Sequence, residues 1–262
     1  MDSWSLVFAA IVLAIALAQF RLRADLVGLA LAAAMVALGG ALLMFRGHPL
    51  GACVALGPVA IYLLVLGTIN LSRRPCLVSG VRDTAALALA VAGLVMVGPA
   101  QLLFPLAASI RLGVFVWVLL FSIYLLAVVL VLLMVRPRLV IYNVSTDELR
   151  PILAEVVSKL DAEARWAQDS LALPTLGVQL HLESLGWLRN VSLVSSGPVQ
   201  NYQGWRRLEL ALGAALARVE VPRNVRAASL VSAGLILAAF LVLTVSRESQ
   251  AVADALVQAI HF

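Results

Sequence analysis

The stretch RPRLVIYNVSTDELRP, residues 136–151, decides how the chain is divided. It follows a long, almost uninterrupted apolar run, yet it has the composition of a water-soluble module. Residues 139–144 form a β-branched and aromatic run that is long enough for one strand. Ser145 and Glu148 then match a capping box, in which their side chains satisfy backbone N–H groups at a helix start. The stretch therefore predicts a strand and a helix that open an α+β module.

The composition of the whole chain is that of a membrane protein. Of its 262 residues 63% are hydrophobic and 13% are charged, and the mean hydropathy is +1.02. These values lie far outside those of soluble domains, so we expect a polytopic membrane protein. The two cysteines, Cys53 and Cys76, match neither a disulfide framework nor a zinc spacing, and no cofactor is expected.

The net charge of +5 does not indicate a nucleic-acid partner. Residues 136–223 carry ten basic and nine acidic side chains, so the polar segment is almost neutral. The other basic residues lie mainly in short connections beside apolar segments, where membrane orientation requires them. The sequence therefore shows no basic patch typical of nucleic-acid binding.

Six segments have the length of about 20 apolar residues that a bilayer requires. We predict spans at residues 4–20, 26–45, 52–71, 85–107, 113–135 and 227–245. The first resembles a signal peptide at Ala16 to Ala18, but Asp2 replaces the usual basic start and Arg21 follows at once, which favours an uncleaved anchor. The expected domains are a five-helix region at 1–135, a module at 136–223, a sixth span at 224–246 and a short amphipathic tail at 247–262.

The charges of the connections alternate along the chain. Arginines are concentrated after the first, third and fifth spans and before the sixth, whereas the second and fourth connections carry only Arg46 and Arg111. By the positive-inside rule both termini lie outside and the 136–223 module is cytoplasmic. Arginine-rich, alanine- and leucine-rich usage favours a bacterial inner membrane.

The predicted spans contain no ionisable residue at hydrocarbon depth. Ion-coupled transporters and intramembrane enzymes need such groups, so this absence argues against a catalytic centre in the membrane. Glycine and proline instead interrupt the third and fourth spans, at Gly57, Pro58, Gly98 and Pro99, with Gln101 close by. The two interruptions resemble an inverted repeat around a transport pathway, although chance similarity and ordinary helix kinks explain them more simply.

The remainder of the module predicts the order strand, helix, strand, strand, helix, strand. Residues 173–177 break the first helix, residues 178–183 alternate as a half-buried strand, and a second strand lies near 188–195. A helix begins near Gln200, and residues 218–221 alternate as a last strand. This is the βαββαβ order of ferredoxin-like folds. The fold class is thus a polytopic α-helical membrane protein with about six spans and an inserted ferredoxin-like α+β module between the fifth and sixth.

Two surfaces of the module are candidate interaction sites. The uncovered sheet face would present polar side chains, which either bind a partner, a ligand or a metal or form a solvated face: Gln179, His181, Glu183, Asn190, Ser192, Arg218 and Glu220. The hairpin tip with Leu185, Trp187 and Leu188 is apolar where turns are normally polar. It either contacts the inner leaflet or a subunit, or folds back as core.

No phosphate-binding loop, nucleophile elbow or metalloprotease motif is present in the sequence. We therefore expect a non-enzymatic inner-membrane protein that contacts the lipid bilayer and whose module binds a protein partner, a ligand or a second copy, as an accessory or sensory subunit. The alternative is a small transporter or channel, with the kinked third and fourth spans as its pathway and the module as its regulator.

Overall fold

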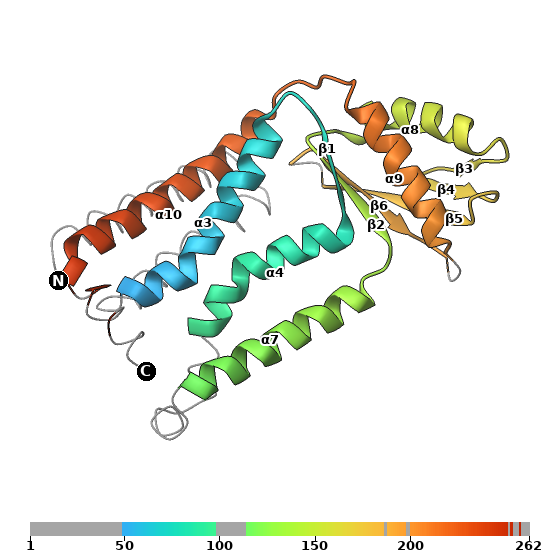
Figure 1. Ribbon diagram of the computed structural model, residues 1–262. Coiled ribbons are helices and arrows are strands. Elements are labelled where there is room, and N and C mark those ends of the chain that lie inside the picture. The colour runs from blue at the N-terminus through green and yellow to red at the C-terminus, as the bar shows by residue number, and fades with distance from the viewer. Residues whose placement is uncertain are drawn as a thin grey trace. The chain divides into compact units, whose positions relative to one another are not determined.

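The computed structural model describes residues 49–97, 114–185, 188–197, 200–250, 252–253 and 257. In this part of the chain, three helices are long and apolar enough to cross a membrane. They lie within α3 (Pro49–Leu71), α4 (Gly80–Val97) and the segment Val225–Arg247, which consists of a short 3-10 turn and α10 (Ala228–Arg247), as Figure 1 shows. The predicted spans at 4–20 and 26–45 lie outside the described residues, so the number six stays a prediction.

Helix α4 begins five residues earlier than the predicted span at 85–107. It starts at Gly80, and its first turn therefore contains Asp83, which the sequence assigned to a connection. A carboxylate is favourable in the first turn of a helix because it faces the positive end of the helix dipole. Helix α4 thus has an acidic residue in its first turn. Residues 98–113, which include its predicted end, lie outside the described part.

Helix α3 packs against α4 and α10 through glycines. A Cβ atom at Gly93 of α4 would lie 1.8 Å from the Val54 carbonyl oxygen, and one at Gly67 of α3 would lie 2.6 Å from the Val231 side chain. At Gly234 of α10 the Leu64 side chain would be 2.8 Å away. These distances are shorter than van der Waals contact, so the helices approach this closely only because glycine has no side chain.

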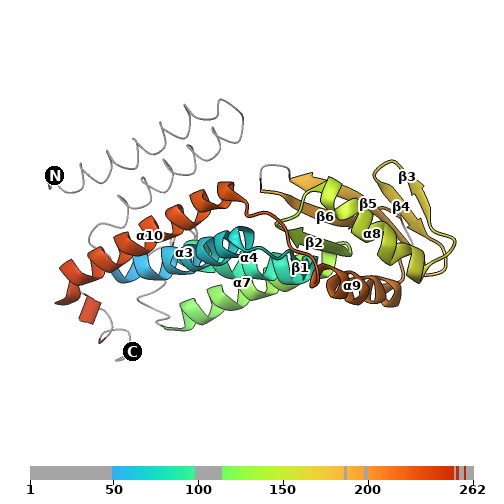
Figure 2. The same cartoon turned by 90° about the horizontal axis from the view of Figure 1, so that it is seen from above.

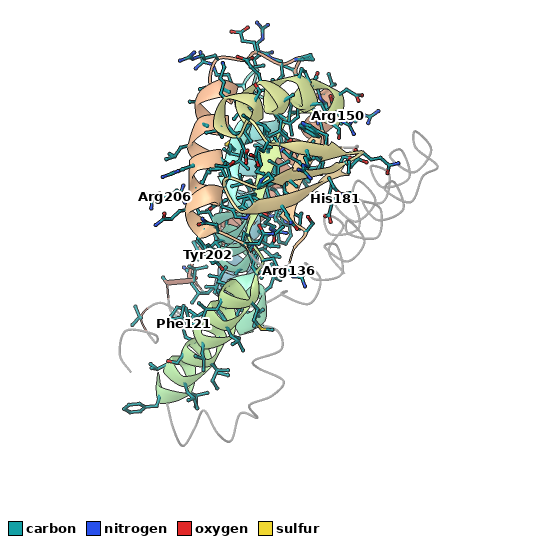
Figure 3. All side chains as sticks on the ribbon, turned by 90° about the vertical axis from the view of Figure 1, so that its right-hand side faces the viewer. Phe121, Arg136, Arg150, His181, Tyr202 and Arg206 are labelled. Carbon is teal, nitrogen blue, oxygen red and sulfur yellow. The ribbon has the colours of Figure 1, made fainter. Side chains whose placement is uncertain are left out.

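Helix α7 (Val114–Met134) is the most apolar of the described helices, and most of its side chains are exposed. Phe121 lies on its surface in Figure 3, and 55% of the residue is accessible. Where it meets α4, Val116 and Leu120 are buried and pack with Met96. The apolar segment Val118–Met134 of α7 is shorter than the three membrane-length helices.

The α+β module is built on one six-stranded sheet, shown from a second side in Figure 2. Its strands are β1 (Cys76–Ser79), β2 (Arg138–Tyr142), β3 (Arg165–Ala167), β4 (Ser170–Leu173), β5 (Val178–Leu185) and β6 (Asn190–Ser195). The order across the sheet is β1-β2-β6-β5-β4-β3, and every neighbouring pair is antiparallel. Strand β6 lies between β2 and β5 in this order.

The last strand of the predicted ferredoxin-like order is wrong. Residues 218–221 form no strand, and the position beside β2 is occupied by β1, which comes from the connection between α3 and α4. That edge of β2 is therefore already paired, and the Val221 N–H instead donates to the Arg73 carbonyl at 2.9 Å. Residues 218–221 alternate in sequence, but they do not pair with the sheet.

A second difference is the hairpin of β3 and β4. The helix α8 (Thr146–Leu160) ends at Leu160, well before the predicted break at 173–177, and the hairpin fills the interval. Its two-residue turn contains Gln168 with a φ of 52° and Asp169, and it has no glycine. Two-residue hairpins are usually recognised by Asn-Gly or Asp-Gly, so the sequence lacked that signal.

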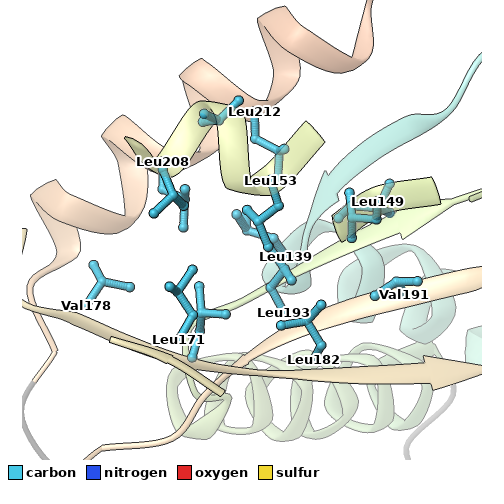
Figure 4. Close-up of a cluster of buried hydrophobic side chains, with 14 of the residues drawn as sticks. Leu139, Leu149, Leu153, Leu171, Val178, Leu182, Val191, Leu193, Leu208 and Leu212 are labelled. Carbon is cyan, nitrogen blue, oxygen red and sulfur yellow. The ribbon is translucent and has the colours of Figure 1, made fainter. Parts of the chain in front are cut away.

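One hydrophobic core joins the sheet to α8 and α9 (Tyr202–Leu216), which cover the same face. Figure 4 shows its leucines and valines, among them Leu153 of α8, Leu208 of α9 and Leu193 of β6. Helix α8 starts as predicted, because Ser145 and Glu148 form the complete capping box. Helix α9 is capped by Asn201, whose side chain accepts from the N–H groups of Gln203 and Gly204.

Candidate functional site

The sheet face opposite α8 and α9 is divided into two halves. Over β2, Val140 and Tyr142 are buried, and α4 packs on this end of the sheet. On β5, Gln179 and Glu183 are exposed on this face. The alternating residues Val178, Leu180 and Leu182 belong to the core on the other face. Strand β5 thus alternates as predicted, and it presents the predicted polar residues on one exposed half-face.

His181 lies in the middle of this exposed half-face, on β5 (Figure 3). Its Nδ1 atom is 3.1 Å from the Ser170 hydroxyl oxygen, and the two residues are directly opposite each other on β4 and β5. A nucleophilic serine needs a histidine that a third group orients. In the described ranges no carboxylate bonds to His181, and no three His, Cys, Asp or Glu residues are grouped as a metal site. The described residues here form an exposed polar strand face with one Ser170–His181 contact.

The other predicted members of this face are buried, half-buried or outside the sheet. Asn190 is buried, and its side-chain oxygen accepts from the Asn143 N–H at 3.2 Å. Ser192 is half-buried and lies opposite Glu183. Arg218 and Glu220 are not in the sheet, because residues 218–221 form no strand. The exposed face is therefore narrower than predicted.

A polar cluster at the start of α4 was not predicted from the sequence. On β2, the Arg138 guanidinium donates to the Asp83 carboxylate and to the Thr84 hydroxyl, at 3.1 Å in each case. The Tyr142 hydroxyl donates to the other oxygen of the Asp83 carboxylate. Burial raises the pKa of the Tyr142 phenol, and its hydrogen bond to Asp83 raises the pKa further. The cluster fixes the sheet to the first turn of α4.

One sequence signal for this cluster was available. Asp83 is the only acidic residue between Asp25 and Asp147, so it stands alone in a long apolar region. Its position also depends on Gly80, because a Cβ atom there would lie 2.0 Å from the Arg138 side chain. The aliphatic part of Arg138 lies across Gly80, and its Nε atom is buried with no partner in the described residues.

Two hydrogen bonds join the α+β module to the residues that follow α3. Asn143 has a φ of 62°, and its side-chain amide donates to the Ser72 carbonyl at 2.7 Å. Asparagine tolerates this left-handed conformation better than most residues, so the end of β2 can turn toward Ser72. The Val221 N–H donates to Arg73, the next residue.

The hairpin between β5 and β6 leads back to the core. Leu188 is only 6% exposed, and its carbonyl accepts from the Asn224 side chain at 2.9 Å. The neighbouring Arg189 contacts both oxygens of the Glu148 carboxylate, at 2.7 and 2.5 Å. Trp187 and the side chain of Leu185, the other candidates at this tip, lie outside the described part.

Two of the candidate pathway residues, Gly57 and Pro58, are adjacent within α3. Pro58 is inside α3, and a Cβ atom at Gly57 would meet nothing within 4 Å in the described chain. Asn70 is fully buried and donates to the Leu66 carbonyl, whereas Thr68 is exposed. Gly98, Pro99 and Gln101 lie outside the described residues.

No family model, no curated protein and no solved structure matches this chain. Function is carried by individual sites rather than by folds. The divided sheet face and the contacts that tie it to α3 and α4 are therefore the basis for a functional assignment.

Proposed function

We propose that this chain is a non-enzymatic integral membrane subunit whose α+β module docks a protein partner and transmits docking to the membrane helices. The single observation that carries the proposal is the divided face of one sheet. At its β2 end the face is buried against α4, and at its β5 end it exposes Gln179 and Glu183. A partner that binds β5 would bind the same continuous sheet that holds α4.

The connection between the sheet and the helices supports transmission. Strand β1 is the direct continuation from α3 to α4, and it is hydrogen bonded into the sheet along its whole length. The Asp83 cluster and the Asn143 contact add side-chain ties at both ends of this connection. A movement of the sheet is therefore passed to both helices, because no flexible linker separates them.

The packing of the helices supports an accessory role over a transport role. Helix α3 is packed against α4 and α10 by close glycine contacts at Gly93, Gly67 and Gly234. Such contacts leave no space for a solute where they occur. We further propose six spans from the lengths of the apolar segments, and a bacterial inner membrane from the arginine-, alanine- and leucine-rich usage. Outside termini and a cytoplasmic module are proposed on the basis of the arginine distribution.

The docking proposal is tested by photo-crosslinking in cells. A photoreactive amino acid replaces Glu183 on the exposed half-face, and a control replaces Lys159, which is exposed on α8. We expect one discrete adduct with another protein from position 183 and none from position 159. Identical patterns from the two positions, or no adduct from position 183, would contradict docking at this face. An adduct of twice the chain mass would show that the partner is a second copy.

The transmission proposal is tested by hydrogen exchange in the unmodified chain and in Asp83→Asn, each with and without the partner that crosslinking identifies. Loss of the carboxylate charge weakens the ties to Arg138 and Tyr142, so α4 should become more mobile relative to the sheet. In Asp83→Asn we expect faster hydrogen exchange of the backbone amides at the start of α4. Partner binding should slow this exchange more in the unmodified chain than in the variant. Equal exchange with and without the partner would exclude transmission while leaving docking intact.

A transporter is the second candidate, and one observation favours it. The side-chain oxygen of Asn70 is buried in α3 without a hydrogen-bond partner in the described residues. A buried polar group of this kind is unfavourable unless a ligand or water satisfies it. Gly57→Leu would place a large side chain beside Pro58, where the described chain leaves open space. Unchanged cellular phenotypes in this variant would count against a pathway there.

A further inference from the structure

A groove of about 770 Å³ lies between the end of α3, strand β1 and helix α9. Its apolar wall includes Ile69 from the last turn of α3, Leu77 from β1 and Leu210 from α9. Leu210 is 67% exposed, which is unusual for a leucine in the middle of a helix that packs on a core. The groove is therefore mostly apolar, and no described side chain fills it.

The position of this groove follows from the end of α3. The apolar segment Leu50–Leu71 has the length of one membrane crossing, and Ile69 lies in its last turn. Residues one turn from the end of a span lie where acyl chains meet headgroups. This step rests on the proposed membrane location of α3. On that basis the groove opens at the surface of the leaflet nearest the module.

Two side chains of opposite charge line the same groove. Arg74 follows α3 and is exposed, and Glu209 is half-buried on α9. Neither forms an ion pair within the part of the chain that the structure describes. A guanidinium binds phosphate oxygens through paired N–H donors, and a carboxylate binds an ammonium group. The groove thus combines an apolar wall with one site for each charge of a zwitterion.

We propose that the groove binds one aminophospholipid, of the phosphatidylethanolamine type, from the adjacent leaflet. Its phosphate lies at Arg74, its ammonium group at Glu209, and an acyl chain lies along Ile69, Leu77 and Leu210. An apolar chain that covers Leu210 removes this side chain from water, which contributes roughly 25 cal/mol for each Å² that is buried. The neighbouring, exposed Arg73 adds positive charge at the phosphate end.

Gly213 of α9 provides a direct test because it forms part of the groove wall. A Cβ atom there would have a single described neighbour, the Leu77 side chain at 3.6 Å, which is an ordinary contact. Gly213→Leu therefore fills the groove without striking the backbone. Gly213→Ala is the matched control, since it adds one methyl group and favours the helix.

Lipid binding is measured by native mass spectrometry of the full-length protein in mild detergent. The purified chain is stripped of lipid and titrated with phosphatidylethanolamine or phosphatidylglycerol. We expect one bound phosphatidylethanolamine in the unmodified chain and in Gly213→Ala, and loss of most of it in Gly213→Leu. Arg74→Gln should weaken binding about tenfold, since it removes one charge-assisted hydrogen-bonding group. Circular dichroism and thermal unfolding confirm that each variant is folded.

Glu209→Gln tests which headgroup the groove selects. It should reduce the preference for phosphatidylethanolamine over phosphatidylglycerol, because only the ethanolamine headgroup carries an ammonium charge. Equal lipid retention by the unmodified chain and Gly213→Leu would overturn the proposed site. Tighter binding of phosphatidylglycerol by the unmodified chain would overturn the proposed headgroup. The crosslinking site at Glu183 shares no residue with the groove, so failure of docking is distinguished from failure of lipid binding.

Discussion

Tyr142, the last residue of β2, donates its hydroxyl hydrogen to the carboxylate of Asp83 in the first turn of α4. The second carboxylate oxygen accepts from Arg138, which lies four residues earlier on the same strand and therefore on the same sheet face. A positive side chain and the positive end of the helix dipole both stabilise the Asp83 charge. One carboxylate thus holds two strand residues against the start of a membrane-length helix.

Tyr142→Phe removes the hydroxyl donor and leaves the aromatic ring in its buried position. We expect the free energy of unfolding to fall by about 1 to 3 kcal/mol, since one oxygen of a partly buried carboxylate loses its partner. Thermal unfolding in detergent measures the change. Tyr202→Phe is the matched control, because Tyr202 is 75% exposed and should change stability little. Equal effects of the two substitutions would show that the Asp83 contact adds nothing.

The same tyrosine predicts how stability depends on alkaline pH. Burial and the hydrogen bond to Asp83 raise the pKa of Tyr142 in the folded chain above its ordinary value of about 10. Its contribution to stability is therefore fully present below pH 10 and is lost as the pH rises from there toward the folded pKa. Unfolding midpoints between pH 9 and 11 should fall more steeply in the unmodified chain than in Tyr142→Phe. Parallel curves would contradict this linkage.

Asp161 predicts a dependence at the acid end of the pH range. Burial acts to raise the pKa of its carboxyl, but the Thr175 hydroxyl and the backbone N–H groups of Glu163, Thr175 and Leu176 together hold the pKa below its ordinary value. The stabilisation is thus present above about pH 4 and is lost as the pH falls through the folded pKa. Asp161→Asn should lower the unfolding midpoint at pH 7 and flatten its decline below pH 4. Glu163→Gln, at an exposed position, is the control.

The sequence predicted those elements whose signal is local. The capping box of Ser145 and Glu148 and the alternation of β5 were both correct, because each depends on residues a few positions apart. The same reasoning selected Gln179 and Glu183 as exposed. The spacing of apolar residues predicts which side of a strand or helix is buried once the type of element is known.

The elements that it missed depend on distant partners. Strand β1 is four residues long and lies between two apolar helices, and only its pairing with β2 makes it a strand. The alternation of residues 218–221 was locally as good, but β1 already occupied the neighbouring edge. The contact between Asp83 and Arg138 was missed because the two residues are more than fifty positions apart in sequence and adjacent only in the folded chain. No local pattern carries that information.

Because α3 and α4 are in close contact at only one of two glycines, alanine substitution should change stability in opposite directions at the two positions. Both Gly57 and Gly93 lie inside helices, where replacement by alanine favours the helix by about 1 kcal/mol. At Gly57 the added Cβ atom meets nothing within 4 Å in the described chain, so Gly57→Ala should raise the unfolding midpoint slightly. At Gly93 the atom would lie 1.8 Å from the Val54 carbonyl oxygen, which is backbone and cannot rotate away.

Gly93→Ala must therefore separate α3 from α4, and such overpacking costs about 1 to 3 kcal/mol, more than the gain in helix propensity. Thermal unfolding of both variants in the same detergent measures the two signs. Gly93→Ser is a further check, since its side chain is slightly larger than that of alanine and should destabilise at least as much. Stabilisation by Gly93→Ala would show that the two helices are not held at this distance, and the tight, glycine-packed bundle behind the accessory role would lose its main support.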